Sequence, residues 1–191
     1  MPPRAALALT LACAAACADD DAATATAGST ATTATTATTA PGEPQDLVDN
    51  ALWQDGDPAL DPLAAHRPAL VECGLAGWYV EVSELEVDTN FCNYADLVQP
   101  ALVDVPAGAT LRVTLRHYDL TAVDPAEAHL ALVIGGDIAW EKHVAIPGPA
   151  AVITEDAPIA AAHPAGTPVH LHLHNHGQNT WIFTSATVTP P

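Results

Sequence analysis

The chain has 191 residues, with five Lys and Arg against 23 Asp and Glu, which gives a formal net charge of -18. Such an anionic surface repels phosphate backbones and anionic lipid headgroups, so it argues against nucleic-acid binding and against electrostatic docking on a membrane. It favours solubility and the attraction of cations, and it also suits salty surroundings. The stretch of globular composition begins near Pro44 and has room for one domain of ordinary size.

Residues 1–16 predict a signal peptide, because Arg4 precedes an apolar run that is too short to span a bilayer. The run ends in AAAC at Cys17, which resembles the lipobox of bacterial lipoproteins, where the Cys is lipidated and begins the mature chain. Cys13 is the alternative lipidation site, and a secretory signal cut near Ala18 without lipid is the rival interpretation. The resemblance implies export and a lipid anchor in the bacterial cell envelope, at the outer membrane or cell surface.

The four cysteines favour lipidation at Cys17, since that choice discards Cys13 with the signal and leaves Cys73 and Cys92 as an even pair. We expect these two to form a disulfide in an oxidising compartment. The loop of about 20 residues that they close contributes roughly 3 kcal/mol through the unfolded state. A metal site at this pair is the weaker interpretation, because neither Cys has a second Cys or His at zinc-ligand spacing.

Residues 17–44 predict a disordered linker that follows the lipidated Cys. Residues 22–40 are almost wholly Ala, Thr, Gly and Ser, so they lack the large apolar side chains that could offset their ordering entropy. We interpret the segment as an inert spacer, although its Thr density also invites O-glycosylation. A domain held on such a stalk works at a surface.

Residues 45–191 predict an all-β domain, a jelly-roll-like antiparallel sandwich of two sheets with about nine strands. In residues 111–117, for example, Leu and Val alternate with Arg and Thr, which is the period of a half-buried strand. Short strands separated by turn residues suit a two-sheet sandwich. The expected strands are residues 78–82, 85–88, 101–105, 111–117, 129–134, 138–145, 151–153, 169–175 and 180–189.

Three segments between residues 106 and 189 carry a resemblance to a known family. They read PAGATLRVTLRHYDL, AHLALVIGGDIAWEKHVAIP and PAGTPVHLHLHNHGQNTWIFTSATV. In pattern they resemble galactose-binding-like jelly rolls and carbohydrate-binding modules. The resemblance implies glycan binding through aromatic and polar groups on loops, but no family binding residue maps onto a definite position of this chain.

Residues 169–177, VHLHLHNHG, contain four of the nine histidines. On a strand, His170, His172 and His174 share one face, and the intervening leucines face the core. Alternate residues lie roughly 6.6 Å apart, whereas zinc holds each nitrogen at about 2.0 to 2.1 Å. Two neighbouring imidazoles can therefore converge on one ion, and further ligands must come from adjacent strands.

A metal site is the second interpretation of this row, and Zn or Cu is the cofactor it would take; no other cofactor is indicated. The candidate ligands are His170, His172, His174, His176, His129, His143 and Glu141, with His117 as a further histidine. The alternatives are a solvated polar face, or histidines that form hydrogen bonds with neighbouring strands and loops.

A ligand-binding rim is predicted at Trp181, Asn175 and Asn179, because this Trp follows a polar turn, whereas Trp78 and Trp140 are expected in the core. Catalytic groups are scarce. The domain has only two serines, neither in a GxSxG context, and its cysteines are expected to be bonded to each other. An enzyme is therefore disfavoured.

Three functions follow in order. The first is a surface-anchored, non-catalytic binding or structural module of the cell envelope, with a glycan or an envelope protein as partner. The second is a histidine-rich metal-binding protein of the envelope. The third is a hydrolase that needs two carboxylates separated by about 5 to 9.5 Å.

Overall fold

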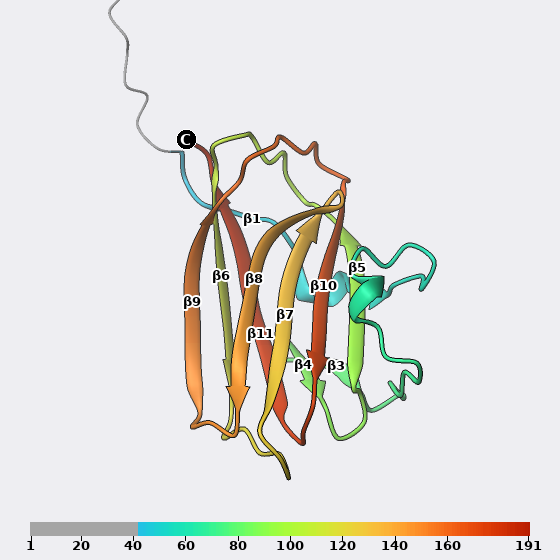
Figure 1. Ribbon diagram of the computed structural model, residues 1–191. Coiled ribbons are helices and arrows are strands. Elements are labelled where there is room, and N and C mark those ends of the chain that lie inside the picture. Colours follow the sequence, from blue (N-terminus) through green and yellow to red (C-terminus); the bar gives the residue numbers. More distant parts are fainter. Residues whose placement is uncertain (1–41) are drawn as a thin grey trace, which may run out of the picture. The chain divides into compact units, whose positions relative to one another are not determined.

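Side chains that alternate between two faces produce the antiparallel strands of this chain. A computed structural model describes residues 42–191, where eleven strands form two sheets (Figure 1). The predicted all-β, two-sheet sandwich is thus confirmed. The strands are β1 (Gln45–Asp46), β2 (Gln54–Asp55), β3 (Trp78–Glu81), β4 (Glu84–Asp88), β5 (Tyr94–Pro100), β6 (Thr110–His117), β7 (Ala126–Ile134), β8 (Asp137–Ile146), β9 (Ala151–Pro158), β10 (Pro168–Asn175) and β11 (Thr180–Thr189).

Sheet A has the strand order β3-β4-β11-β6-β9, with β1 also paired to β11, and sheet B has the order β2-β5-β10-β7-β8. On β6, Leu111 and Val113 are fully buried between the sheets. Arg112 and Arg116 lie on the opposite face of the same strand, where they form ion pairs with Asp156 and Glu84. Burial of the inner faces supplies most of the free energy that holds the sheets together.

The inner face of β10 agrees with the prediction, because Leu171 and Leu173 belong to the core. Trp140 and Trp181 are buried in the same core, and Trp78 packs against it while partly exposed. The histidines of β10 therefore stand on the outer face of sheet B, as the alternation predicted.

One predicted strand is wrong. Residues 101–105 form a connection, in which the backbone N–H groups of Ala101 and Leu102 donate to Thr167 and Leu47 at 2.8 and 2.9 Å. The strand at this place is β5, Tyr94–Pro100, which the sequence analysis missed because Asp96 and Gln99 interrupt its apolar pattern. Pro100 has no backbone N–H to continue the ladder, so the strand ends there.

Residues 56–77, which we call the covering segment, lie over the outer face of sheet B. In Figure 1 this blue-green to green segment runs beside β5 and carries the 3-10 helix η2 (Ala64–His66). Leu63 of the segment packs with Ala131 and Val133 of β7 in a small apolar cluster of its own. Side chains on this part of the sheet are consequently shielded from water, although they lie outside the main core.

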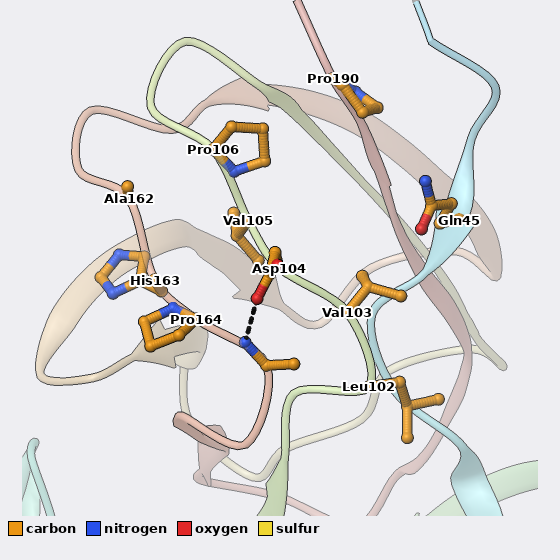
Figure 2. Close-up of a pocket in the computed structure, with 11 residues that line it drawn as sticks. Gln45, Leu102, Val103, Asp104, Val105, Pro106, Ala162, His163, Pro164 and Pro190 are labelled. Carbon is orange, nitrogen blue, oxygen red and sulfur yellow. Dashed lines mark hydrogen bonds between the residues drawn. The ribbon is translucent and has the colours of Figure 1, made fainter.

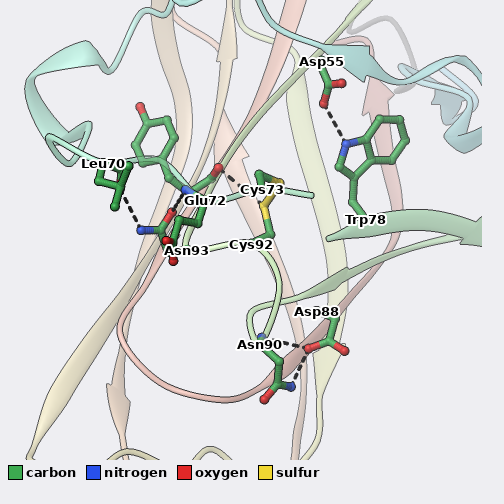
Figure 3. The surroundings of a disulfide bond; sticks show 10 residues. Asp55, Leu70, Glu72, Cys73, Trp78, Asp88, Asn90, Cys92 and Asn93 are labelled. Atoms are coloured by element: carbon green, nitrogen blue, oxygen red, sulfur yellow. Dashed lines mark hydrogen bonds between the residues drawn. A yellow bond between two sulfur atoms is a disulfide. The ribbon is translucent and has the colours of Figure 1, made fainter. Parts of the chain in front are cut away.

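A disulfide fixes the end of the covering segment. Cys73 and Cys92 are bonded at an S–S distance of 2.00 Å, which confirms the predicted pair (Figure 3). Beside it, the side chain of Asn93 accepts a hydrogen bond from Glu72 N at 2.9 Å and donates one to Leu70 O at 3.0 Å. These bonds attach the segment to the turn that precedes β5.

The signal peptide, the lipidation sites Cys17 and Cys13 and the linker up to Pro41 lie outside the described residues. Within residues 42–191, no helix is long and apolar enough to cross a membrane.

Candidate metal centre

Four neighbouring strands bring polar side chains together on the outer face of sheet B. The strand register places His174 of β10 between Tyr94 of β5 and His129 of β7. On the next strand, β8, His143 lies opposite His129. A second row runs through Asp96, His172, Ala131 and Glu141. Because every strand presents alternate residues to this face, the rows form one continuous polar patch.

Three side chains of this patch, His129, Glu141 and His143, form what we call the outer site. One ligand atom from each lies within 4.8 Å of the other two. His129 Nε2 is 2.8 Å from Glu141 Oε1, and His143 Nε2 is 3.9 Å from the same oxygen. The two imidazole rings are stacked, with centroids 4.5 Å apart. Two imidazole nitrogens and a carboxylate oxygen are ligands suited to zinc.

The orientation of His143 favours metal binding. Its Nδ1 is 2.7 Å from Glu127 Oε1, which leaves Nε2 directed toward Glu141. Histidines that bind metals commonly donate the other ring N–H to a carboxylate in this way. The side chains of Glu141 and His143 are 41% and 48% exposed, so an ion can reach the site from solvent.

His172 lies deeper, beneath the covering segment, and is 1% exposed. Neither of its ring nitrogens has a hydrogen-bond partner among residues 42–191. Burial lowers the pKa of His172 to about 3, with the neighbouring His129 as a smaller cause. Burial is also the main cause that lowers the pKa of His129 and of His174. At neutral pH these three rings are uncharged, the state in which imidazole binds metals.

His66 joins the cluster from the covering segment. Its ring centroid is 4.6 Å from that of His129 and 6.0 Å from that of His172. The sequence analysis did not select His66, because a single histidine in a turn-rich segment carries no spacing signal. Its position depends on the path of the covering segment over the sheet, which the pattern of strands does not specify.

Buried charges lie next to the imidazoles. Asp61 Oδ2 accepts a hydrogen bond from Tyr94 Oη at 2.5 Å and one from Arg67 at 3.2 Å. Desolvation and this carboxylate raise the pKa of Tyr94. Asp96 Oδ1 lies 2.8 Å from His170 Nδ1. The predicted ligand His170 is thus bonded to Asp96 and stands apart from the outer site.

The other predicted ligands take different places. His174 contacts Tyr94 and His176, with ring centroids 5.6 and 4.5 Å away, at the end of β10. His117 belongs to sheet A, where its ring packs against Trp181 at 4.7 Å and its Nδ1 lies 2.8 Å from Tyr118 O. The structure therefore brings His129, Glu141, His143 and His172 together and leaves His117 elsewhere.

The predicted ligand-binding rim is corrected by the structure, because Trp181, Asn175 and Asn179 are 2 to 4% exposed. The Trp181 indole N–H donates to Asn175 Oδ1 at 3.2 Å, and the Asn179 amide donates to the same oxygen at 3.3 Å. Asn175 in turn donates to Thr89 Oγ1 at 3.0 Å. These groups satisfy one another inside the turn between β10 and β11, so they do not present an exposed rim.

A wide groove of about 820 Å³ lies elsewhere, where the loops before β6 and β10 meet (Figure 2). Its walls are mainly aliphatic and proline side chains, such as Leu102, Val105 and Pro106. The Asp104 carboxylate accepts a hydrogen bond from Ala165 N at 2.8 Å and so ties the two loops together. Because its main carboxylate is engaged in holding the loops, we assign this groove a structural role.

No protein-family model matches the chain, and no curated protein matches it by sequence. The chain is similar to a solved structure described as "CBM4 structure and function", with 14% identity, a TM-score of 0.41 and coverage of 78% of this chain and 95% of that one. A structure of TmCBM61 in complex with β-1,4-galactotriose has 9% identity, a TM-score of 0.38 and coverage of 75% and 97%. A structure of PfGH50B has 10% identity and a TM-score of 0.35, and the match covers 66% of this chain and 23% of that one. Two of these neighbours are carbohydrate-binding modules, but similarity at this level transfers no ligand or activity to this chain.

Proposed function

We propose that the protein is a binding module of the bacterial cell envelope that holds a divalent transition metal, Zn²⁺ or Cu²⁺, at the outer site. The observation that carries the proposal is the convergence of ligand atoms from His129, Glu141 and His143 within 4.8 Å of one another. Three strand-borne ligands are held by a sheet, so little conformational entropy is lost when an ion binds.

The chemistry of the three ligands supports this choice of ion. Two neutral imidazoles and one carboxylate suit zinc and copper, whereas calcium and magnesium prefer sites built of oxygen atoms. The Glu141 carboxylate supplies a compensating negative charge, and Glu127 holds His143 in the ligating orientation. The surplus of 23 acidic over five basic side chains also attracts cations toward the surface.

We propose further that the protein is exported and lipid-anchored through Cys17. The Cys73–Cys92 disulfide supports this placement, since disulfides persist in oxidising compartments outside the cytoplasm. Metabolic labelling with a palmitate analogue tests the anchor: loss of the label in Cys17→Ser supports it, and a label unaffected by that change contradicts it. Binding of a glycan or an envelope protein stays a prediction from the sequence, for which a glycan array with the folded domain is the direct test.

Calorimetric titration of the metal-free protein with Zn²⁺ and Cu²⁺ tests the metal site. The outer site contains the carboxylate and faces solvent, so we expect it to fill first. His143→Ala should weaken this first binding step at least ten-fold, because it removes one of three ligands. Glu141→Gln should weaken it as well, because an amide provides no charge.

His176→Ala is the matched control for this titration. His176 is an exposed histidine beyond the end of β10, outside the outer site. We expect the control to bind like the parent protein. A His143→Ala variant that binds the first ion as tightly as the parent would contradict the proposed function.

A further inference from the structure

Two nitrogens of His172 stand without a hydrogen-bond partner in the described part of the chain, although the residue is 1% exposed. Its neighbours within ring-contact distance are aromatic: Tyr94 at 5.0 Å and His129 at 4.8 Å between centroids. The Tyr94 hydroxyl is occupied by Asp61 and does not serve the imidazole. Buried polar groups are almost always bonded in native proteins, so a completely unbonded imidazole indicates a missing partner.

His129 offers a second nitrogen on the same side. Its Nε2 faces Glu141 at the outer site, at 2.8 Å. Its Nδ1 is buried and has no partner among residues 42–191. The ring of His129 therefore lies between the outer site on one edge and unsatisfied space next to His172 on the other.

His66 completes a triangle with these two residues. The three ring centroids are 4.6, 4.8 and 6.0 Å apart. Three imidazoles bound to one tetrahedral ion, with metal–nitrogen bonds of about 2.0 to 2.1 Å, place their centroids roughly 5 Å apart. The observed separations thus need only small rotations of the rings for their nitrogens to converge on a common point.

We propose that His66, Nδ1 of His129 and His172 form a second transition-metal position, the inner site, beneath the covering segment. The inference depends on the proposed function in one respect, since His129 belongs to both sites. A set of three neutral imidazoles suits borderline ions such as Zn²⁺ and copper.

The surroundings of the inner site are suited to a buried cation. Asp61 acts electrostatically on His172, and Asp96 lies opposite His172 in the sheet register. Both carboxylates are buried, so their charge is poorly screened by water. When the two sites are filled together, His129 bridges the ions through its two nitrogens, and the proton of the neutral ring leaves to solvent.

Native mass spectrometry of protein stripped with EDTA and reloaded with Zn²⁺ tests the inner site. We expect two ions per parent chain and one ion in His66→Ala and in His172→Leu. His143→Ala should keep one ion, held at the inner site, and His176→Ala should keep two. Because His66 is an exposed residue of a loop, its replacement leaves the sheet intact and remains decisive if His172→Leu fails to fold.

Loading with Co²⁺ provides a second measurement, since a tetrahedral site with imidazole ligands absorbs visible light. The absorption assigned to the inner site should disappear in His66→Ala and persist in His143→Ala. Equal stoichiometry in the parent, His66→Ala and His172→Leu overturns the inner site.

The two proposals fail in different ways. If the parent holds one ion that His143→Ala loses and His66→Ala keeps, the outer site stands and the inner site is rejected. If the single ion is lost in His66→Ala and kept in His143→Ala, the inner site stands and the outer site is rejected. A parent chain that binds no Zn²⁺ rejects both.

Discussion

His172 is a destabilising residue in the metal-free protein, because its donor and acceptor are buried without partners in the described chain. Leaving such groups unsatisfied costs about 1 to 3 kcal/mol. Replacing His172 by Leu, which has a similar volume, should therefore raise the free energy of unfolding by about 1 to 2 kcal/mol in EDTA. Urea unfolding followed by tryptophan fluorescence measures this change. In saturating Zn²⁺ the order should reverse, and a Leu variant less stable than the parent in EDTA would contradict the reasoning.

The same residue predicts how stability changes with pH. The pKa of His172 is about 3 in the folded protein, against an ordinary value of 6.5. Below pH 6.5 the unfolded chain takes up a proton that the folded chain does not bind. The stability is therefore complete above pH 6.5 and declines as the pH falls toward 3, by up to about 1.4 kcal/mol per pH unit from this group. The slope of unfolding free energy between pH 6.5 and 4.5 should be shallower in His172→Leu; equal slopes would exclude His172 as the cause.

At the scale of single residues, the sequence predicted which way side chains point better than what they contact. Alternation was sufficient to place His172 opposite the core leucines and to select His129, His143 and Glu141 as partners from other strands. It could not identify His66 or Asp61, since these lie in a segment without periodicity. The buried state of His172 also depends on that segment, which is why a solvated row was an alternative at the sequence stage of reasoning.

Between β3 and β4, the element scale offers a turn in which two non-glycine residues have positive φ, Val82 at 48° and Ser83 at 68°. Two-residue hairpin turns of this kind favour Asn-Gly, and a β-branched residue is strained in the left-handed region. Val82→Asn together with Ser83→Gly should raise the free energy of unfolding by about 1 to 2 kcal/mol. Thermal and urea unfolding measure the gain, with Val80→Asn on the adjacent strand as a control that should not stabilise. A double variant less stable than the parent would show that the turn is not strained.

Asn50 connects this hairpin to β11 at an irregularity between Phe183 and Ser185. Its amide donates to Ser83 O, Phe183 O and Thr184 O at 2.9 to 3.2 Å, and its Oδ1 accepts from the buried Trp53 indole at 3.0 Å. Asn50→Ala leaves these groups unsatisfied, so it should lower the free energy of unfolding by about 2 to 3 kcal/mol.

Asp49→Ala is the comparison for Asn50→Ala. Asp49 caps η1 (Asn50–Leu52) through an exposed hydrogen bond to Ala51 N at 2.9 Å. Its loss should cost about 1 kcal/mol or less. Urea unfolding of both variants separates the two effects, and equal losses would mean that the Asn50 bonds contribute no more than a helix cap.

Elements were predictable where alternation was regular and where turn residues marked their ends, as for β6 and β10. β5 was missed because polar residues such as Asp96 occupy its outer face beneath the covering segment, where the sequence suggests a loop. The two-residue strands β1 and β2 carry too few positions for any period. Their pairing depends on contacts with β11 and β5 that lie far away in the sequence.

For the whole molecule, composition and spacing were enough to predict two antiparallel sheets and a disulfide. The layer order was not predictable, because β10 and β11 join different sheets although only four residues separate them. That crossing places the histidine strand at the centre of sheet B, between β5 and β7, where neighbours on both sides contribute polar groups. An edge strand with the same sequence would have had neighbours on one side only.

The charge distribution predicts a dependence of stability on salt. The four basic side chains of the described residues, Arg67, Arg112, Arg116 and Lys142, are all paired with carboxylates. Since acidic groups far outnumber them, most carboxylates repel one another in the folded chain more strongly than in the expanded one. At 0.1 M salt the Debye length is about 10 Å, so raising NaCl from 10 mM to 300 mM should screen this repulsion and raise the unfolding free energy by on the order of 1 kcal/mol. Urea is the denaturant for the measurement, because guanidinium would itself act as the salt, and EDTA removes the metal as a second source of stability. A stability that falls with added salt would mean that the four ion pairs outweigh the repulsion among the remaining carboxylates.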